Sequence, residues 1–148
     1  MKMNRLQRFY TTLKRFISKS CIGPQTLLTR FILSKQAYKK DRVLPGAFTI
    51  KESETEISVF RIDGLSDNVI WEIGKNYIIP RRPDRHIHAR ADLEALAIME
   101  LGLKIRPDNN PARHTLITNL PKEKYERQEI AIKLSEASRL ILPSPPLK

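Results

Sequence analysis

The spacing of apolar side chains from residue 57 onward predicts strands that alternate with helices. Residues 57–62 carry β-forming side chains with a period of two, which predicts a strand, and Asp63-Gly64 follows as a turn. Ser66 is a good N-cap for a helix over residues 67–77. The helical spacing turns four of its side chains toward the core: Val69, Ile70, Ile73 and Tyr77.

The second half of the chain continues this alternation with shorter strands. Asp92 is expected to cap a helix over residues 93–101, and Gly102 stands where that helix should end. Short strands are predicted at residues 103–106, 114–118 and 140–142. Pro121 precedes a helix over residues 122–138, whose apolar face holds Tyr125, Ile130, Ala131, Leu134 and Ala137.

The pattern before residue 57 leaves more than one assignment open. Residues 3–19 place apolar side chains at helical spacing between Arg and Lys, which predicts a basic amphipathic helix. Residues 25–38 fit a second helix, or alternatively a short strand at 28–33, because the apolar run is too short to separate the two. Residues 39–45 are expected to form a loop and residues 47–50 a short extended segment.

This order of elements favours the α+β class, with a small mixed sheet, helices packed on it and a basic amphipathic helix in front. A chain of 148 residues is large enough for one domain with a substantial core. We therefore expect a helical extension at residues 1–26, a single mixed α/β domain at 27–142 and a loose, proline-rich tail at 143–148.

The charge of the chain is concentrated near its beginning. The formal net charge is +11, and residues 1–42 hold eleven basic side chains but only one acid. Such a segment creates a local positive field that suits nucleic acid, an anionic membrane surface or an acidic protein. No window of 18 residues is free of charge, so we expect no transmembrane segment.

The first twenty residues contain no acid and are rich in Arg, Ser and Thr. Three roles are open for them: docking on the domain, organellar targeting, or binding to a membrane surface or nucleic acid. Cys21 is the single thiol, and charged residues interrupt every apolar run that a secretory signal would need. These features favour a reducing interior, and a cytoplasmic location is therefore expected.

Two histidines near the middle of the chain are candidates for metal binding. On a strand, His86 and His88 would point to the same side, where two imidazoles suit a metal ion or an acid–base pair. The sequence offers no companion motif for a third ligand, and an exposed basic loop is the simpler interpretation. We expect neither a metal nor a cofactor.

A third histidine follows the polar loop at residues 107–113. His114 can act as a general acid or base, and Arg113 suits a phosphate or a carboxylate. The alternative is a structural turn in which Arg113 pairs with an acid such as Asp108. The functional alternative to this turn is a catalytic role for His114 and Arg113, assisted by His86 or His88.

Three arginines form a further candidate site. Arg61, Arg90 and Arg113 either cluster to capture an anion or belong to ion-pair networks with neighbouring aspartates. The chain lacks a glycine-rich phosphate loop, a Walker lysine, a nucleophile-elbow motif and a His-Glu-x-x-His motif. With only five glycines, a dinucleotide-binding Rossmann domain is not expected.

Five short segments between about residues 28 and 142 are the basis of a resemblance to known proteins. They are Arg42-Val43-x-Pro45-x-Ala47-Phe48, Ser58-Val59-Phe60-Arg61-x-x-Gly64-Leu65, Arg90-Ala91-Asp92, Gly102-Leu103 and Pro111-x-Arg113-His114. In these segments the chain resembles a family of small, uncharacterised bacterial proteins. That family has no assigned activity, so the resemblance implies no functional residue. It implies only that residues 1–26 are an extension added to the domain.

The leading hypothesis is a small non-enzymatic protein whose basic N-terminal third contacts nucleic acid, without sequence specificity, or an acidic protein partner. The side chains expected to make these contacts are Arg5, Arg8, Lys14, Arg15, Lys19, Lys35, Lys39 and Lys40. One alternative is an enzyme that processes phosphodiesters or nucleotides with His114 and Arg113. A second alternative is a docking subunit of a larger assembly, and the oligomeric state is left open.

Overall fold

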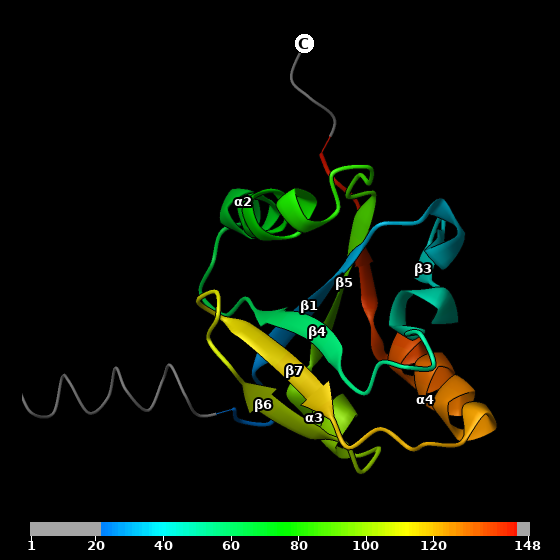
Figure 1. Ribbon diagram of the computed structural model, residues 1–148. Coiled ribbons are helices and arrows are strands. Elements are labelled where there is room, and N and C mark those ends of the chain that lie inside the picture. Colours follow the sequence, from blue (N-terminus) through cyan, green and yellow to red (C-terminus); the bar gives the residue numbers. More distant parts are fainter. Residues whose placement is uncertain (1–21, 145–148) are drawn as a thin grey trace, which may run out of the picture.

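A six-stranded antiparallel sheet forms the centre of the protein (Figure 1). The structure is a computed structural model and describes residues 22–144. The strand order is β6–β7–β4–β1–β5–β8, with β1 Leu27–Ile32, β4 Ile57–Arg61, β5 Ala89–Glu94, β6 Lys104–Pro107, β7 His114–Thr118 and β8 Arg139–Ile141. Helices pack on this sheet, which confirms the α+β class, and every strand pair among residues 22–144 is antiparallel.

Both faces of the sheet are covered, and each face has its own apolar core. Helices α3 (Ala95–Met99) and α4 (Lys124–Ala137) pack on one face against buried side chains that include Leu28, Val59 and Ile117. Helix α2 (Asp67–Tyr77) covers part of the other face, and Figure 1 shows it on the opposite side of the sheet from α4. Beneath α2, Ile70 packs with Phe31 and Phe60. The region of β4 and β7 is therefore positioned between two cores.

The segment at residues 25–38 was assigned either to a helix or to a short strand at 28–33, and the structure confirms the strand, β1, so the helix is wrong. β1 lies in the middle of the sheet, between β4 and β5. Leu28 and Ile32 are buried on one face, and Phe31 is buried on the other. A strand buried on both faces has no alternation of polar and apolar residues, and its continuous apolar run therefore resembles a helix segment.

Two neighbouring expectations also need correction. The segment expected to be a loop forms a small hairpin of β2 (Tyr38–Lys39) and β3 (Arg42–Val43). The first two residues of the segment expected to be extended, Ala47 and Phe48, belong instead to a 3₁₀ helix, Pro45–Phe48, with its proline in the first turn. Proline fixes φ near the helical value and suits that place. Ala47 and Phe48 of this 3₁₀ helix are buried and belong to the same core as α4.

Asp92 does not cap a helix, because it lies within β5. Its carboxylate accepts a 2.7 Å hydrogen bond from the hydroxyl of Thr29 and a 3.1 Å bond from Nε of Arg90. Helix α3 begins after Glu94, whose side chain makes no capping hydrogen bond. The tertiary partners of Asp92 therefore outweigh its local preference for a cap.

The strands and turns predicted after residue 57 are largely confirmed, whereas some helix faces are not. Helix α2 spans the predicted residues, and Ser66 caps it by accepting from the backbone N–H of Val69. Val69 and Tyr77, however, are 45% and 41% exposed, and Tyr125 of α4 is 74% exposed. Since α2 and α4 lie at the surface of the fold, only part of each apolar stripe is covered.

Candidate functional site

Strands β1 and β4 pair along only part of their length. Their register joins Leu28 to Arg61 and Thr29 to Phe60. The Arg30 side chain comes next on β1 and reaches across to β4, where its Nη1 donates a 2.9 Å hydrogen bond to the carbonyl of Ser58. Its Nε donates a 3.1 Å bond to the carbonyl of Ala47. A guanidinium thus takes the place of a backbone donor where the two strands separate.

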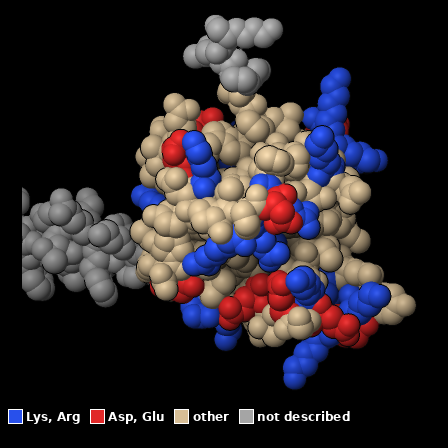
Figure 2. Space-filling model, turned by 45° about the horizontal axis from the view of Figure 1, so that its top comes forward, with Lys and Arg blue, Asp and Glu red and all other residues tan. Residues whose placement is uncertain are grey.

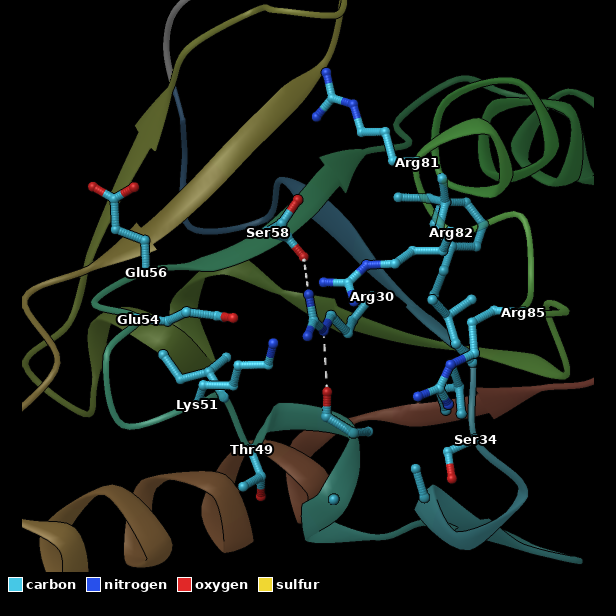
Figure 3. Close-up of a pocket in the computed structure, with 18 of the residues that line it drawn as sticks. Arg30, Ser34, Thr49, Lys51, Glu54, Glu56, Ser58, Arg81, Arg82 and Arg85 are labelled. Carbon is cyan, nitrogen blue, oxygen red and sulfur yellow. Dashed lines mark hydrogen bonds between the residues drawn. The ribbon is translucent and has the colours of Figure 1, made fainter.

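A pocket of about 420 Å³ opens at this separation (Figure 3). Its lining is rich in cations and also includes two carboxylates. The cationic side chains are those of Arg30, Lys51, Arg81, Arg82 and Arg85, and the carboxylates are those of Glu54 and Glu56. The three arginines at 81–85 follow α2, in the 3₁₀ helix Ile79–Arg81 and the turn after it. The sheet therefore supplies the inner arginine, and exposed loops supply the other cations.

The charges around Arg30 act on it in opposite directions. Burial lowers the pKa of Arg30 most, the charge of Glu54 raises it, and the neighbouring charge of Arg82 lowers it. Arginine remains charged in proteins despite such a shift. Glu56 forms an ion pair with Arg106, in which Oε1 of Glu56 lies 2.9 Å from Nη2 of Arg106. In Figure 2, Lys and Arg side chains gather across the middle of the face that is turned forward.

A chain of two hydrogen bonds joins Ser58, His114 and Asp108 beside this pocket. Ser58 Oγ lies 2.5 Å from Nε2 of His114, and Nδ1 of the same ring lies 2.7 Å from Oδ1 of Asp108. Strand β4 supplies the serine, β7 supplies the histidine and the β6–β7 turn supplies the aspartate. Of the three, Ser58 lines the pocket and is partly exposed, whereas the His114 side chain is 11% exposed.

The position of the His114 ring is restrained from several sides. Its backbone carbonyl accepts from the N–H groups of Asp108 and Asn109, at 3.2 and 3.1 Å, which folds the turn back onto β7. The Phe60 ring, opposite His114 in the β4–β7 register, meets its ring edge to face at 5.2 Å. Asn109 adopts φ of +51°, a left-handed conformation that asparagine tolerates. The turn therefore brings Asp108 onto the ring from the side opposite Ser58.

The electrostatics of Asp108 favour its ionised form. Partial burial alone would raise the pKa of Asp108, but hydrogen bonds from the Asn110 backbone and from His114 lower it, as do the charges of His114 and Arg106. The net pKa is below the ordinary value. An ionised carboxylate accepts hydrogen bonds only, so Nδ1 of His114 carries the proton. In the neutral ring, Nε2 is then the acceptor for the Ser58 hydroxyl.

The two remaining histidines lie together at another place. The rings of His86 and His88 contact each other edge to face, with centroids 6.4 Å apart. Neither belongs to the hydrogen-bond chain of His114. Within residues 22–144 no group of three His, Cys, Asp or Glu side chains is arranged to hold a metal ion.

The three arginines expected to cluster are divided between two sites. Nη2 of Arg61 donates to Oδ1 of Asn109, and Nη1 of Arg113 donates to the backbone carbonyls of Arg61 and Asp63. The pKa of Arg61 is lowered by burial and by the charge of Arg113, with Asp63 opposing. These contacts attach the turn before β7 to the end of β4.

Arg90 belongs to a separate ion-pair network, which was the alternative interpretation. It pairs with Asp92 at 3.1 Å and Asp67 at 2.8 Å, and its guanidinium lies 4.8 Å from the Trp71 ring centroid. The side chains of Arg90 and Asp92 are only 6% and 11% exposed. This network joins β5 to α2.

The basic residues expected to bind a partner are only partly placed. Lys35, Lys39 and Lys40 are exposed on the 3₁₀ helix Lys35–Ala37, strand β2 and the turn that follows. Arg5, Arg8, Lys14, Arg15 and Lys19 lie outside the described residues, as does the helix expected there. Between residues 22 and 144, no helix is long and apolar enough to cross a membrane.

Sequence reasoning selects His114 but misses its partners. The sequence suggested an ion pair between Asp108 and Arg113, whereas in the structure Asp108 is hydrogen-bonded to His114. Sequence reasoning does not select Ser58, because nothing in the chain reveals that β4 and β7 are neighbours. The pocket could have been suspected from one feature of the sequence, the arginine-rich segment at residues 81–85.

Comparisons with protein-family models, with curated proteins and with solved structures give no match.

Proposed function

We propose that this protein binds the phosphate backbone of nucleic acid, without sequence specificity, at the pocket between β1 and β4. The observation that carries the proposal is the set of five cationic side chains that line one cavity of about 420 Å³. Guanidinium groups match phosphate oxygens in two-pronged hydrogen bonds, and three arginines lie within the five residues 81–85. The bases would remain outside this contact.

Two further features support nucleic acid as the ligand. The net charge of +11 attracts polyanions over distances beyond direct contact. Exposed Lys35, Lys39 and Lys40 extend the basic surface from the chain segment that also contributes Ser34 and Ala37 to the pocket. A cytoplasmic location, where nucleic acid and reduced thiols occur together, is part of the same proposal.

Binding of a fluorescent single-stranded oligonucleotide, measured by anisotropy at several salt concentrations, tests the proposal. The full chain is expected to bind and to lose affinity steeply between about 50 and 200 mM salt, since each neutralised phosphate releases counterions. Replacing Arg81, Arg82 and Arg85 by Gln together should weaken binding and reduce the logarithmic salt slope by about 2, at roughly 0.7 per contact.

The matched control removes the same charge elsewhere. Lys75, Lys104 and Lys133 are exposed and do not line the pocket, so their replacement by Gln should weaken binding far less. Equal losses in the two triple variants would show that net charge, and not the pocket, attracts the ligand. Tighter binding to polyglutamate than to the oligonucleotide would indicate an acidic protein partner instead.

A third variant separates the pocket from the N-terminal segment. It replaces five basic residues by Gln: Arg5, Arg8, Lys14, Arg15 and Lys19. If this variant loses binding while the pocket variant keeps it, the binding element is the N-terminal segment and the proposed site is wrong.

A further inference from the structure

We infer that Ser58 is a catalytic nucleophile, activated by His114, that hydrolyses a phosphodiester held in the cationic pocket. This inference rests on the proposed function for its substrate class, because the nucleic acid backbone is itself a phosphodiester. The supporting observation is independent of charge: a serine hydroxyl, an imidazole and a carboxylate are hydrogen-bonded in series, at 2.5 and 2.7 Å. That series is the arrangement by which a hydroxyl becomes a nucleophile.

The orientation of the imidazole suits a general base. Asp108 holds the proton of the ring on Nδ1, which leaves Nε2 free to accept the hydroxyl proton of Ser58. The aspartate is itself held by the N–H of Asn110, at 3.2 Å, and Phe60 contacts the ring at its side. Asp108 is therefore a positioning residue, whereas His114 and Ser58 would touch the reacting atoms.

The serine is also placed where a substrate can reach it. Ser58 lines the pocket, and its carbonyl is turned toward Arg30, whereas its hydroxyl points away from Arg30, to the side from which Arg81 extends (Figure 3). The Arg81 guanidinium on that side can stabilise the negative charge that develops on the phosphoryl oxygens. An anionic ester is thus favoured over a neutral one.

The proposed reaction proceeds in two steps. Ser58 Oγ attacks phosphorus while His114 takes its proton; the Oγ–P bond forms, and on the opposite side of phosphorus the bond to one alcohol breaks as a solvent water protonates the departing oxygen. Water then attacks phosphorus from that opposite side and loses a proton to solvent, and the Oγ–P bond breaks as His114 returns its proton to the serine. One phosphodiester and one water yield one phosphomonoester and one alcohol.

Hydrolysis of bis(4-nitrophenyl) phosphate by the full chain, followed by nitrophenolate release, tests the inference. EDTA is present to suppress contaminating metal-dependent nucleases. Ser58→Ala and His114→Gln should each lower kcat at least about 100-fold, the usual contribution of a nucleophile or general base. Asp108→Asn should lower kcat with little change in KM, because it acts on the orientation of His114.

A covalent probe reports on the serine even when turnover is slow. An alkyl fluorophosphonate should modify Ser58 with loss of fluoride, detected by mass spectrometry of the peptide that contains it. Ser53→Ala is the matched control, since Ser53 is exposed and outside the pocket lining, and it should leave both hydrolysis and labelling unchanged. Thermal melts confirm that each variant is folded.

The outcomes separate this inference from the proposed function. If the oligonucleotide binds but the phosphodiester is not hydrolysed and Ser58 is not labelled, the three residues only stabilise the β6–β7 turn. The catalytic inference is then wrong, whereas the proposed binding of nucleic acid stands. If 4-nitrophenyl acetate is hydrolysed but the diester is not, the substrate class is wrong. Retention of oligonucleotide binding by Ser58→Ala, with loss of hydrolysis, supports both.

Discussion

Arg30 of β1 is hydrogen-bonded to Ser58 of β4 beyond the last residues at which the two strands pair. Its Nη1 donates a 2.9 Å hydrogen bond to the carbonyl of Ser58, at the place where backbone pairing between β1 and β4 has ended. The side chain thereby satisfies a carbonyl of β4 and forms part of the pocket lining. The same residue thus contributes both to the continuity of the sheet and to the charge of the candidate site.

Replacing Arg30 by Met should destabilise the fold by about 2–4 kcal/mol. The change removes the donors of two hydrogen bonds, to Ser58 and Ala47, and leaves those carbonyls without them. Urea unfolding measures the loss. Arg42→Met, at an exposed position of β3, is the control and should stay within about 0.5 kcal/mol. Equal effects of the two substitutions would contradict a bridging role for Arg30.

Gly74 allows α2 to approach the sheet closely. A Cβ atom at this position would lie 2.6 Å from Cδ1 of Ile87 and 2.8 Å from Cε1 of Phe31. Gly74→Ala should therefore destabilise the protein by about 1–3 kcal/mol through overpacking, although alanine is the better helix former. Asn76→Ala, at an exposed position of the same helix, provides the comparison in thermal melts. A stabilising Gly74→Ala would show that α2 can shift at little cost.

The two carboxylates that face Arg90 should contribute unequally to stability. The Asp92 side chain is 11% exposed and that of Asp67 is 52% exposed. Asp92→Ala leaves a buried cation with one partner fewer and should cost about 3 kcal/mol or more. Asp67→Ala should cost at most about 1 kcal/mol, because its ion pair is screened by solvent. Denaturant unfolding, with Trp71 fluorescence as the signal, measures both, and a reversed order would refute this account.

The strands and turns after residue 57 could be predicted because their signals are local. A run of β-forming side chains marks β4, and Ser66 marks the start of α2 through its own hydrogen bond. Gly102 has φ of +77° where the helix was expected to end. Each of these features depends only on residues a few positions apart.

The features that were missed depend on contacts between distant segments. The sequence could not distinguish β1 from a helix, because both faces of this strand are buried. Asp92 was expected to cap a helix but instead accepts a hydrogen bond from Thr29, which is 63 residues away. Ser58 and His114 are separated by 56 residues and meet only because β4 pairs with β7. A single sequence contains no signal for that pairing, so the candidate site could be predicted only in its histidine.

The ionised Asp108 should make stability depend on pH in the acidic range. Its pKa in the folded protein lies below the ordinary value, while the unfolded chain titrates near about 3.9. The unfolded state therefore binds the proton first as pH falls, and unfolding becomes easier. The stabilisation is complete above the unfolded pKa and is lost as pH falls through the folded one.

Comparing wild type with Asp108→Asn between neutral pH and pH 3 measures this contribution. The variant cannot ionise at this position, so the stability difference between the two proteins should shrink as pH falls below about 4. Asp84→Asn, at an exposed carboxylate on the 81–85 turn, is the control and should change stability little at any pH. A stability difference that stayed constant down to pH 3 would show that the Asp108 carboxylate gains nothing from His114 and Asn110.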